Sequence, residues 1–181
     1  MSTSAPNTTD KPAVESKRWR LDPTRSRVEF HTPTFWGLMT VKGRFERYHG
    51  SLDLRQQPAI ELTIEAASLN TKNNIRDKHL RSGDFFDVEN YAHVRFVSDS
   101  AKLNGERLTV SGRLYAAGVS MPLDVDARLR AVDSELEVDA TAYAEHLTLG
   151  MSRGALGMIR TPSQLIVRGR LVPDADSPAG A

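Results

Sequence analysis

The segment Leu108–Ala142 decides the fold class, and it reads LTVSGRLYAAGVSMPLDVDARLRAVDSELEVDATA. Apolar and polar residues alternate with a period of two through three runs, which is typical of β-strands that bury one face. The runs are separated at Gly118-Val119 and at Val132-Asp133, where two-residue hairpin loops fit. The segment therefore predicts a three-stranded antiparallel meander with one apolar face and one charged face.

The two hairpin registers can be tested by the residue pairs that they create. A type II′ turn with Gly118 first gives three pairs on the apolar face: Leu114 with Leu123, Gly112 with Val125, and Val110 with Ala127. Centring the second turn on Val132-Asp133 adds two more pairs: Leu129 with Leu136, and Ala127 with Val138. On the charged face this second register pairs Arg130 with Glu135, which is favourable. It also places Asp126 opposite Asp139, and these like charges count against it.

The same alternation recurs along the rest of the chain. Five further runs show it: Arg27–His31, Thr40–Phe45, Ile60–Ala66, Val94–Ser98 and Leu165–Leu171. Only one segment, about Lys72 to Phe86, looks helical. We therefore predict about eight strands in an all-β sandwich or barrel. A tight turn at Asn104-Gly105 would turn Phe96 outward, so we expect a bulge or a longer loop there.

The composition sets the class of protein. The chain has 181 residues and 39% hydrophobic residues, enough for one domain with a packed core. Its net charge of +1 argues against a dedicated nucleic-acid binder. The absence of cysteine excludes disulfides and thiolate metal sites. No apolar run approaches the roughly 18 residues that a membrane-spanning helix needs.

The ends of the chain differ from its middle. Residues 1–17 and 173–181 are poor in large apolar residues, so we expect two disordered tails around a folded body at 18–172. The first residues show no secretory signal, which favours a cytoplasmic location. The body carries a net charge of +3, which gives only a weak attraction to an anionic membrane, so we expect any membrane contact to be transient.

The apolar face has two interpretations. It forms a filled core, or it lines a cavity, since an eight-stranded barrel can just enclose one small ligand. Several inward positions are small and leave space that either large neighbours or a ligand must fill: Ala66, Gly112, Ala127, Ala140 and Gly169. The pattern alone leaves this choice open.

A series of short motifs, in order, resembles the YceI-like family of polyisoprenoid-binding, lipocalin-like barrels. The series begins with Trp19-Arg20-Leu21-Asp22-Pro23, Ser26–Phe30 and Val41–Phe45. It continues with Ser68-Leu69-Asn70-Thr71, Arg76–Ser82, Asp84–Asp87 and Glu89-Asn90-Tyr91, and ends with Val94–Phe96, Val110–Leu114 and Gly118-Val119. The resemblance covers about Trp19 to Val172. The chain departs from the family pattern at Ala92, where proline is usual, and at Ser152–Gly157.

The resemblance implies an extended, antiparallel, eight-stranded lipocalin-like barrel with one short helical insertion. It also implies that the interior binds, carries or sequesters a long isoprenoid lipid, such as a quinone or a polyprenyl lipid. The mechanism would be burial, without a catalytic group, a metal or a cofactor. The family often dimerises, so a homodimer is a further expectation.

The candidate ligand-binding residues are those that the alternation places on the inner face of a strand or that the resemblance implies. The lipid tail would lie against Phe30, Phe45, Leu62, Ile64, Phe96, Leu114, Val125 and Val138. The mouth would be shaped by Trp36, Leu80, Phe85, Phe86 and Met158. The head-group candidates are Arg76, His79 and Arg153, since an arginine binds phosphate with two parallel hydrogen bonds. A salt-bridged surface helix is the alternative for Arg76 and His79.

Two other functions stay open. One is an enzyme that acts on a small lipid in the same cavity, with Asp84 or His79 as the group to test. Turns or helix caps explain Asp84 and Asp87 more simply. The other is a ligand-free interaction barrel that uses its charged outer face. The five histidines lack the spacing of a metal site.

Overall fold

The computed structural model describes residues 14–34, 38–145 and 162–174. The strands are β1 (Arg18–Leu21), β2 (Arg27–Thr34), β3 (Met39–Phe45), β4 (Tyr48–Asp53), β5 (Ala59–Glu65), β6 (Leu69–Asn70), β7 (His93–Asn104), β8 (Arg107–Ala116), β9 (Val119–Val132), β10 (Glu135–Ala144) and β11 (Ser163–Pro173). A 3-10 turn spans Ala66–Ser68, and one helix, α1, spans Asn74–Arg81. In the described ranges no helix is long and apolar enough to span a membrane.

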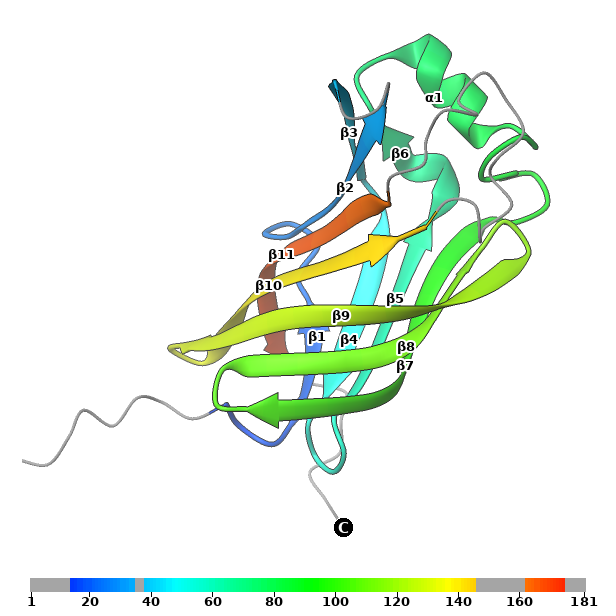
Figure 1. Cartoon of the computed structure of the whole chain (residues 1–181). Coiled ribbons are helices and arrows are strands. Elements are labelled where there is room, and N and C mark those ends of the chain that lie inside the picture. The colour runs from blue at the N-terminus through cyan, green and yellow to red at the C-terminus, as the bar shows by residue number, and fades with distance from the viewer. Residues whose placement is uncertain (1–13, 35–37, 146–161, 175–181) are drawn as a thin grey trace, which may run out of the picture.

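The strands close into an antiparallel barrel (Figure 1). Neighbours around the ring are β1, β4, β5, β7, β8, β9, β10 and β11, and the pairing of β1 with β11 closes it. The eight-stranded, all-β barrel with one short helix is therefore confirmed. Two of the ring strands, β1 and β4, escape the sequence pattern, because Arg18–Leu21 is short and Tyr48–Asp53 alternates poorly.

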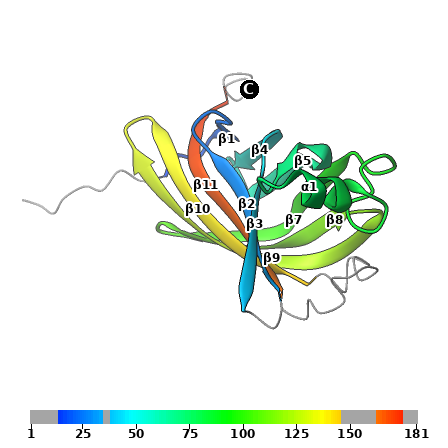
Figure 2. The same cartoon turned by 90° about the horizontal axis from the view of Figure 1, so that it is seen from above.

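A second tier of strands rises from one end of the ring. β11 pairs with β1 through Leu171 and then with β2 through Leu165, so β2 continues the wall above β1. β3 continues it above β4, and the two-residue β6 pairs with β3. Figures 1 and 2 show α1 beside this tier, at the same end of the molecule. We refer to this end, which carries α1, as the open end, and the far end holds the β1–β11 closure.

The first predicted register is wrong by two residues. Val110 pairs with Val125 and Gly112 with Leu123, so the loop is Ala117-Gly118. Both loop residues have positive φ, 48° for Ala117 and 76° for Gly118, which defines a type I′ rather than a type II′ turn. A register shift of two residues keeps every side chain on its predicted face of the sheet. The apolar face was therefore predicted correctly.

The second predicted register is also wrong by two residues, and the true one removes its unfavourable pair. The loop is Asp133-Ser134, and Val138 pairs with Leu129. Asp126 now lies opposite Thr141, while Asp139 lies opposite Arg128. The like charges are therefore separated, and Asp139 makes an ion pair with Arg168 at 3.1 Å.

The expected bulge is present, but it lies inside β7 and not at the Asn104-Gly105 corner, where the loop is Gly105-Glu106. The loop itself is tight, since Asn104 pairs with Arg107. The register of β7 against β8 shifts between Ser98 and Ser100, which leaves Asp99 as an extra residue. The bulge keeps Phe96 on the inner face, where it pairs with Leu114.

The helix is shorter than predicted and begins at a capping asparagine. Asn73 has extended backbone, and its side-chain oxygen accepts a hydrogen bond from the Arg76 backbone N–H at 3.0 Å. The helix ends at Arg81, and turns at residues 83–86 and 88–90 follow it.

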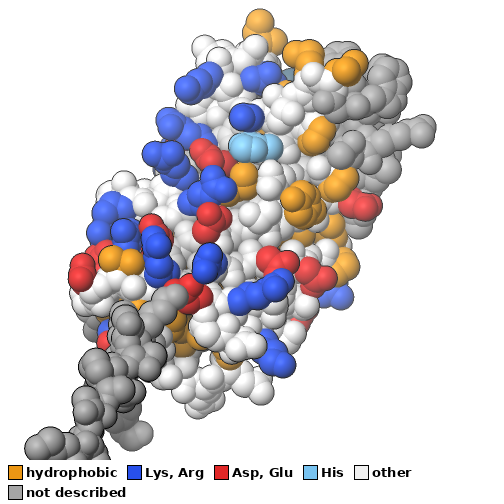
Figure 3. All heavy atoms as spheres, turned by 60° about the vertical axis from the view of Figure 1, so that its left-hand side comes forward, with side chains coloured by type: hydrophobic (Ala, Val, Ile, Leu, Met, Phe, Trp, Pro, Cys, Tyr) orange, Lys and Arg blue, Asp and Glu red, His pale blue; other side chains and the backbone are white. Residues whose placement is uncertain are grey.

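Opposite charges alternate on the outer face, as Figure 3 shows for one side of the molecule. One cluster ties the β1–β2 connection to the start of β10. Arg25 donates to Asp22 at 2.7 Å and to both carboxylate oxygens of Glu135 at 2.9 and 2.8 Å. Thr24 and Arg25 hydrogen bonds lower the pKa of Asp22, and the Arg25 hydrogen bond lowers the pKa of Glu135.

These lowered pKa values predict a loss of stability in acid. The ionised carboxylates favour the folded state above the ordinary pKa values of 3.8 for Asp and 4.5 for Glu. Their contribution is lost as the pH falls through the lowered pKa of each folded group. The difference in melting temperature between wild type and Glu135→Gln should therefore be largest near pH 6 and shrink below about pH 4.5. A difference that stays constant from pH 6 to pH 2 would contradict this assignment.

Candidate functional site: the cavity inside the barrel

The barrel is filled at its closed end and hollow above it. Trp19 and Leu136 are almost completely buried and lie outside the lining of the cavity. Above them is a cavity of about 730 Å³. This volume falls within the range of about 300–1,000 Å³ that small-molecule sites occupy. The two interpretations of the apolar face therefore each hold for one part of the barrel.

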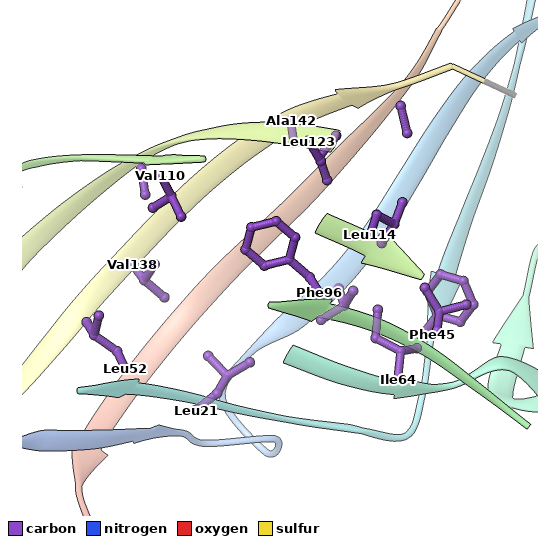
Figure 4. Close-up of a cluster of buried hydrophobic side chains, with 14 of the residues drawn as sticks. Leu21, Phe45, Leu52, Ile64, Phe96, Val110, Leu114, Leu123, Val138 and Ala142 are labelled. Carbon is purple, nitrogen blue, oxygen red and sulfur yellow. The ribbon is translucent and has the colours of Figure 1, made fainter. Parts of the chain in front are cut away.

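The inward faces of the strands make the wall of the cavity. Figure 4 shows side chains from different strands pointing toward one another, among them Leu21, Leu52, Val110 and Val138. All candidate residues that the structure describes line the cavity: Phe30, Phe45, Leu62, Ile64, Leu80, Phe85, Phe86, Phe96, Leu114, Val125, Val138, Arg76 and His79. Trp36, Met158 and Arg153 lie outside the described residues. Contact of any of these residues with a ligand stays a prediction.

Two glycines make room for aromatic rings in the wall of the cavity. A Cβ atom at Gly43 would come within 2.3 Å of Phe30 Cζ, and one at Gly112 within 2.7 Å of Phe96 Cζ. Both distances are shorter than any real Cβ contact, so the rings occupy the space that a side chain would take. Large neighbours, rather than open space, therefore fill the gap that the sequence leaves at Gly112.

Aromatic rings gather beneath the open end. Phe45 lies 5.6 Å from Phe30 and 5.9 Å from Phe86 between ring centroids, and the Phe45–Phe86 contact is edge-to-face. Phe85 is buried, and it packs edge-to-face against His79 at 5.0 Å. Because Phe85 and Phe86 lie four and five residues after the end of α1 and line the cavity, these rings join the helical segment to the barrel.

A buried carboxylate holds α1 in place. Asp77 is only 5% exposed, and it accepts hydrogen bonds from the backbone N–H of Thr71 at 3.0 Å and from its hydroxyl at 2.5 Å. Arg81 donates to the backbone carbonyls of Ala67 and Leu69 at 2.9 and 2.5 Å. The helix is therefore joined to the chain around β6 by charge-assisted hydrogen bonds.

The predicted head-group candidates have structural partners. Arg76 donates from Nε to the Thr71 hydroxyl at 2.8 Å and from Nη2 to the Thr71 carbonyl at 2.9 Å. His79 Nε2 lies 3.8 Å from Asp84 Oδ2, and both side chains are exposed. Asp87 accepts hydrogen bonds from Asn90 Nδ2 at 3.0 Å, which supports its interpretation as a turn residue. Among the described residues no group of three or more His, Asp or Glu side chains could hold a metal ion.

The residues that sequence reasoning missed lie on the same inward faces. They include the apolar residues Leu21, Val28, Leu52, Val94, Leu108, Leu123, Leu129, Leu165, Val167 and Leu171. Most of them could have been identified from the sequence, because they occupy the alternate, inward-facing positions of their strands. Polar residues that the sequence did not suggest also line the cavity: Glu29, Thr32, Ser51, Glu61, Thr141 and Ser163. Thr32 and Ser163 share the inward faces of Phe30 and Leu165, but a hydroxyl on an apolar face gives no clear signal in the sequence.

Comparison with known proteins places this barrel in a family. The model of the YceI-like domain matches residues 19–168. A UPF0312 protein of Photorhabdus laumondii is 39% identical over 97 residues, which cover 51% of this chain and 50% of that protein. Protein YceI of Escherichia coli O157:H7 is 34% identical over 97 residues, or 51% of each chain. The chain thus spans about half the length of the curated relatives that it matches.

Solved structures share the same fold at low sequence identity. Burkholderia cenocepacia BcnA has a TM-score of 0.76 and 16% identity, with 84% of this chain and 99% of that chain covered. A polyisoprenoid binding domain from Saccharophagus degradans has a TM-score of 0.71 and 16% identity, with 86% and 98% covered. At such identities the likeness concerns the fold alone. With the family model matching from Trp19 to Arg168, the chain belongs to the YceI-like domain family.

Proposed function

We propose that this protein binds a long isoprenoid chain inside its barrel and carries or sequesters it. The observation that carries the proposal is the cavity of about 730 Å³ with a wall of inward-facing apolar side chains. A solved domain of the same fold is described as polyisoprenoid-binding, which agrees with it.

Burial of apolar surface is sufficient as the mechanism. Each buried methylene contributes about 0.8 kcal/mol, and ordering of the chain removes most of that sum. A net gain of about 0.3 kcal/mol per heavy atom remains for ligands of drug size. A chain of roughly 40 carbons would then bind with about 12 kcal/mol, which corresponds to nanomolar affinity. No step in this mechanism requires catalysis.

Native mass spectrometry of the purified protein, followed by organic extraction, tests the proposal. One adduct of isoprenoid composition per chain is the expected result. If the protein is purified empty, added quinone or polyprenol should form the same adduct. Failure of both experiments would overturn the proposal and favour a ligand-free interaction barrel. Turnover of the bound lipid that is lost in His79→Ala would favour an enzyme.

We further propose that the open end of the barrel touches an anionic membrane while lipid is loaded. Leu38 and Ile75 are 85% and 86% exposed, an unusual state for aliphatic side chains, and they lie on the β2–β3 connection and the first turn of α1. Lys42 and Lys78 are exposed on β3 and α1. Figure 1 places β3 and α1 at the same end of the molecule.

The double variant Leu38→Asp/Ile75→Asp tests this contact. It should sediment with vesicles of anionic phospholipid at least about tenfold more weakly than wild type, because two apolar anchors are lost and two repelling charges are added. Val132→Asp, a half-exposed apolar residue on the β9–β10 hairpin at the opposite end of β9, is the matched control. Equal sedimentation of all three proteins would exclude a membrane contact through this end.

A further inference from the structure

Three large side chains end the cavity at the β1–β11 closure. Trp19, Leu54 and Leu136 are 2%, 7% and 1% exposed, and all three lie outside the lining of the cavity. Leu21 and Leu171 lie opposite each other in β1 and β11, and both line the cavity. The boundary between the cavity and the packed end of the barrel therefore falls between these two layers of side chains. We call Trp19, Leu54 and Leu136 the floor of the cavity.

Contacts on several sides hold Trp19 in the floor. Its backbone lies opposite Leu52 of β4 and opposite Pro173 of β11. Lys17 Nζ lies 4.8 Å from the centroid of the indole ring and covers one face of it. The Lys17 carbonyl in turn accepts a hydrogen bond from the backbone N–H of Leu54 at 3.0 Å. Strand pairing and packing therefore fix the position of Trp19, which makes the floor a fixed boundary.

The two ends of the cavity differ in polarity. The inward side chains nearest the floor are aliphatic, namely Leu21, Leu52 and Leu171. At the other end α1 contributes Arg76 and His79 to the lining. A polar group that is buried without a hydrogen bond costs free energy, so the polar head of an isoprenoid belongs at the α1 end. The last isoprene units of the chain would then lie against the floor.

A fixed floor limits how much of an isoprenoid chain the barrel can bury. Burial of one more isoprene unit increases affinity about tenfold, at the net gain per heavy atom that is usual for ligands of drug size. Units that find no room between the floor and α1 stay in water and add nothing to the affinity. The affinity should therefore rise with chain length up to a limit and stay constant beyond it.

We infer that the floor sets the longest isoprenoid chain that the barrel can bury, and that Trp19 is the main determinant of this limit. The indole of Trp19 has nearly as many heavy atoms as two isoprene units. The part of Leu136 that an alanine lacks has fewer heavy atoms than one unit. The inference rests on the proposed function and adds a specificity for chain length to it.

A series of polyprenols that differ only in chain length tests the inference. Titration followed by native mass spectrometry gives the affinity for each length, and hence the limit. In Trp19→Ala the limit should move to chains about one to two isoprene units longer, because the neighbours collapse only partly into the vacated space. Polyprenols above the wild-type limit should then bind at least about tenfold more tightly than they bind to wild type. Leu136→Ala should increase their affinity about three- to fivefold, because it vacates less space.

Two further variants carry the test if Trp19→Ala does not fold. Val138→Phe raises the floor, since Val138 lines the cavity two residues beyond Leu136 on the same face of β10. Its limit should move to chains about one isoprene unit shorter. Leu69→Ala is the matched control for Leu136→Ala, because Leu69 is also fully buried outside the lining but lies in β6, at the end that carries α1. Its limit should equal that of wild type.

Each other outcome has a distinct meaning. If the limit is the same in wild type, Leu136→Ala and Val138→Phe, or if wild type shows no limit, the floor does not select chain length and the inference is overturned while the proposed function stands. A shift in Leu69→Ala as large as that in Leu136→Ala would overturn it too, because loose packing anywhere would then admit longer chains. If wild type binds no polyprenol of any length, the proposed function itself fails.

Discussion

Val125→Arg is expected to weaken isoprenoid binding by at least about a hundredfold. Val125 lies in β9 between Val110 of β8 and Ala142 of β10, and it lines the cavity. An arginine there must place its charge among apolar side chains, at an effective cost of several kcal/mol. Each 1.4 kcal/mol reduces affinity tenfold, so two such steps already give a hundredfold loss. Titration of the purified variant with a fluorescent or natural polyprenyl ligand measures the effect.

A second variant keeps this prediction testable if Val125→Arg does not fold. Ala140→Phe adds uncharged volume at a second cavity-lining position, which lies in the neighbouring strand β10. It should lower ligand affinity at least about tenfold while the protein stays folded, because the new ring fills space without a charge. Thr109→Arg, on the outer face beside Asp126, should leave binding unchanged. Normal binding by a folded Ala140→Phe variant would mean that the ligand lies elsewhere.

Asp77→Ala is expected to release α1 and speed the escape of the ligand. The change removes the acceptor of two hydrogen bonds from Thr71, each of which is worth about 1.5–3 kcal/mol because the acceptor is charged. The Thr71 backbone N–H then remains buried without this partner. We expect a stability loss of about 3 kcal/mol, concentrated in the segment from Thr71 to Tyr91. Since Leu80, Phe85 and Phe86 line the cavity and belong to the segment that Asp77 holds, ligand dissociation should be about tenfold faster or more.

Hydrogen exchange and ligand-release kinetics check this prediction together. Exchange should increase in residues 71–91 and stay unchanged in β8, β9 and β10. Asp84→Ala is the matched control, because Asp84 is exposed and follows the same helix. If Asp77→Ala loosens the helix and the ligand leaves at the wild-type rate, then α1 does not control the mouth.

The inner and outer faces of the strands could be predicted, and the pairing of the strands could not. Alternation identifies Leu114, Val125 and Val138 as inward whichever register holds, because a shift of two residues preserves the face. The choice between registers depended on the turns. Ala117 has a positive φ of 48°, which is uncommon for a residue with a side chain, so the sequence did not indicate a loop at Ala117-Gly118. The opposed Asp126 and Asp139 were the one sign of the error.

The apolar residues that line the cavity could be predicted from the sequence, and the hydrogen bonds of the polar residues could not. Apolar residues such as Phe30 and Phe96 are recognised by their parity and size. The sequence suggested Arg76 as a head-group ligand, yet its guanidinium donates hydrogen bonds to Thr71, five residues away in sequence. No sequence pattern indicates such a local hydrogen bond. Thr32 and Ser163 are 131 positions apart in sequence, so only the fold brings their hydroxyls together.

The pairing of β1 with β11 has a consequence for the order of folding. The meander of β7 to β10 is built from hairpins whose partners are close in sequence, so its contacts cost little chain entropy and can form early. Closure needs β1 and β11 to meet, and the pair of Trp19 with Pro173 has the longest range in sequence of all pairs in the ring. Until then β1 and β10 each lack the neighbour that β11 supplies, and their open edges can pair with strands of other molecules. During synthesis on the ribosome these edges stay unpaired until β11 emerges. The topology therefore exposes the nascent chain to aggregation before the barrel can close.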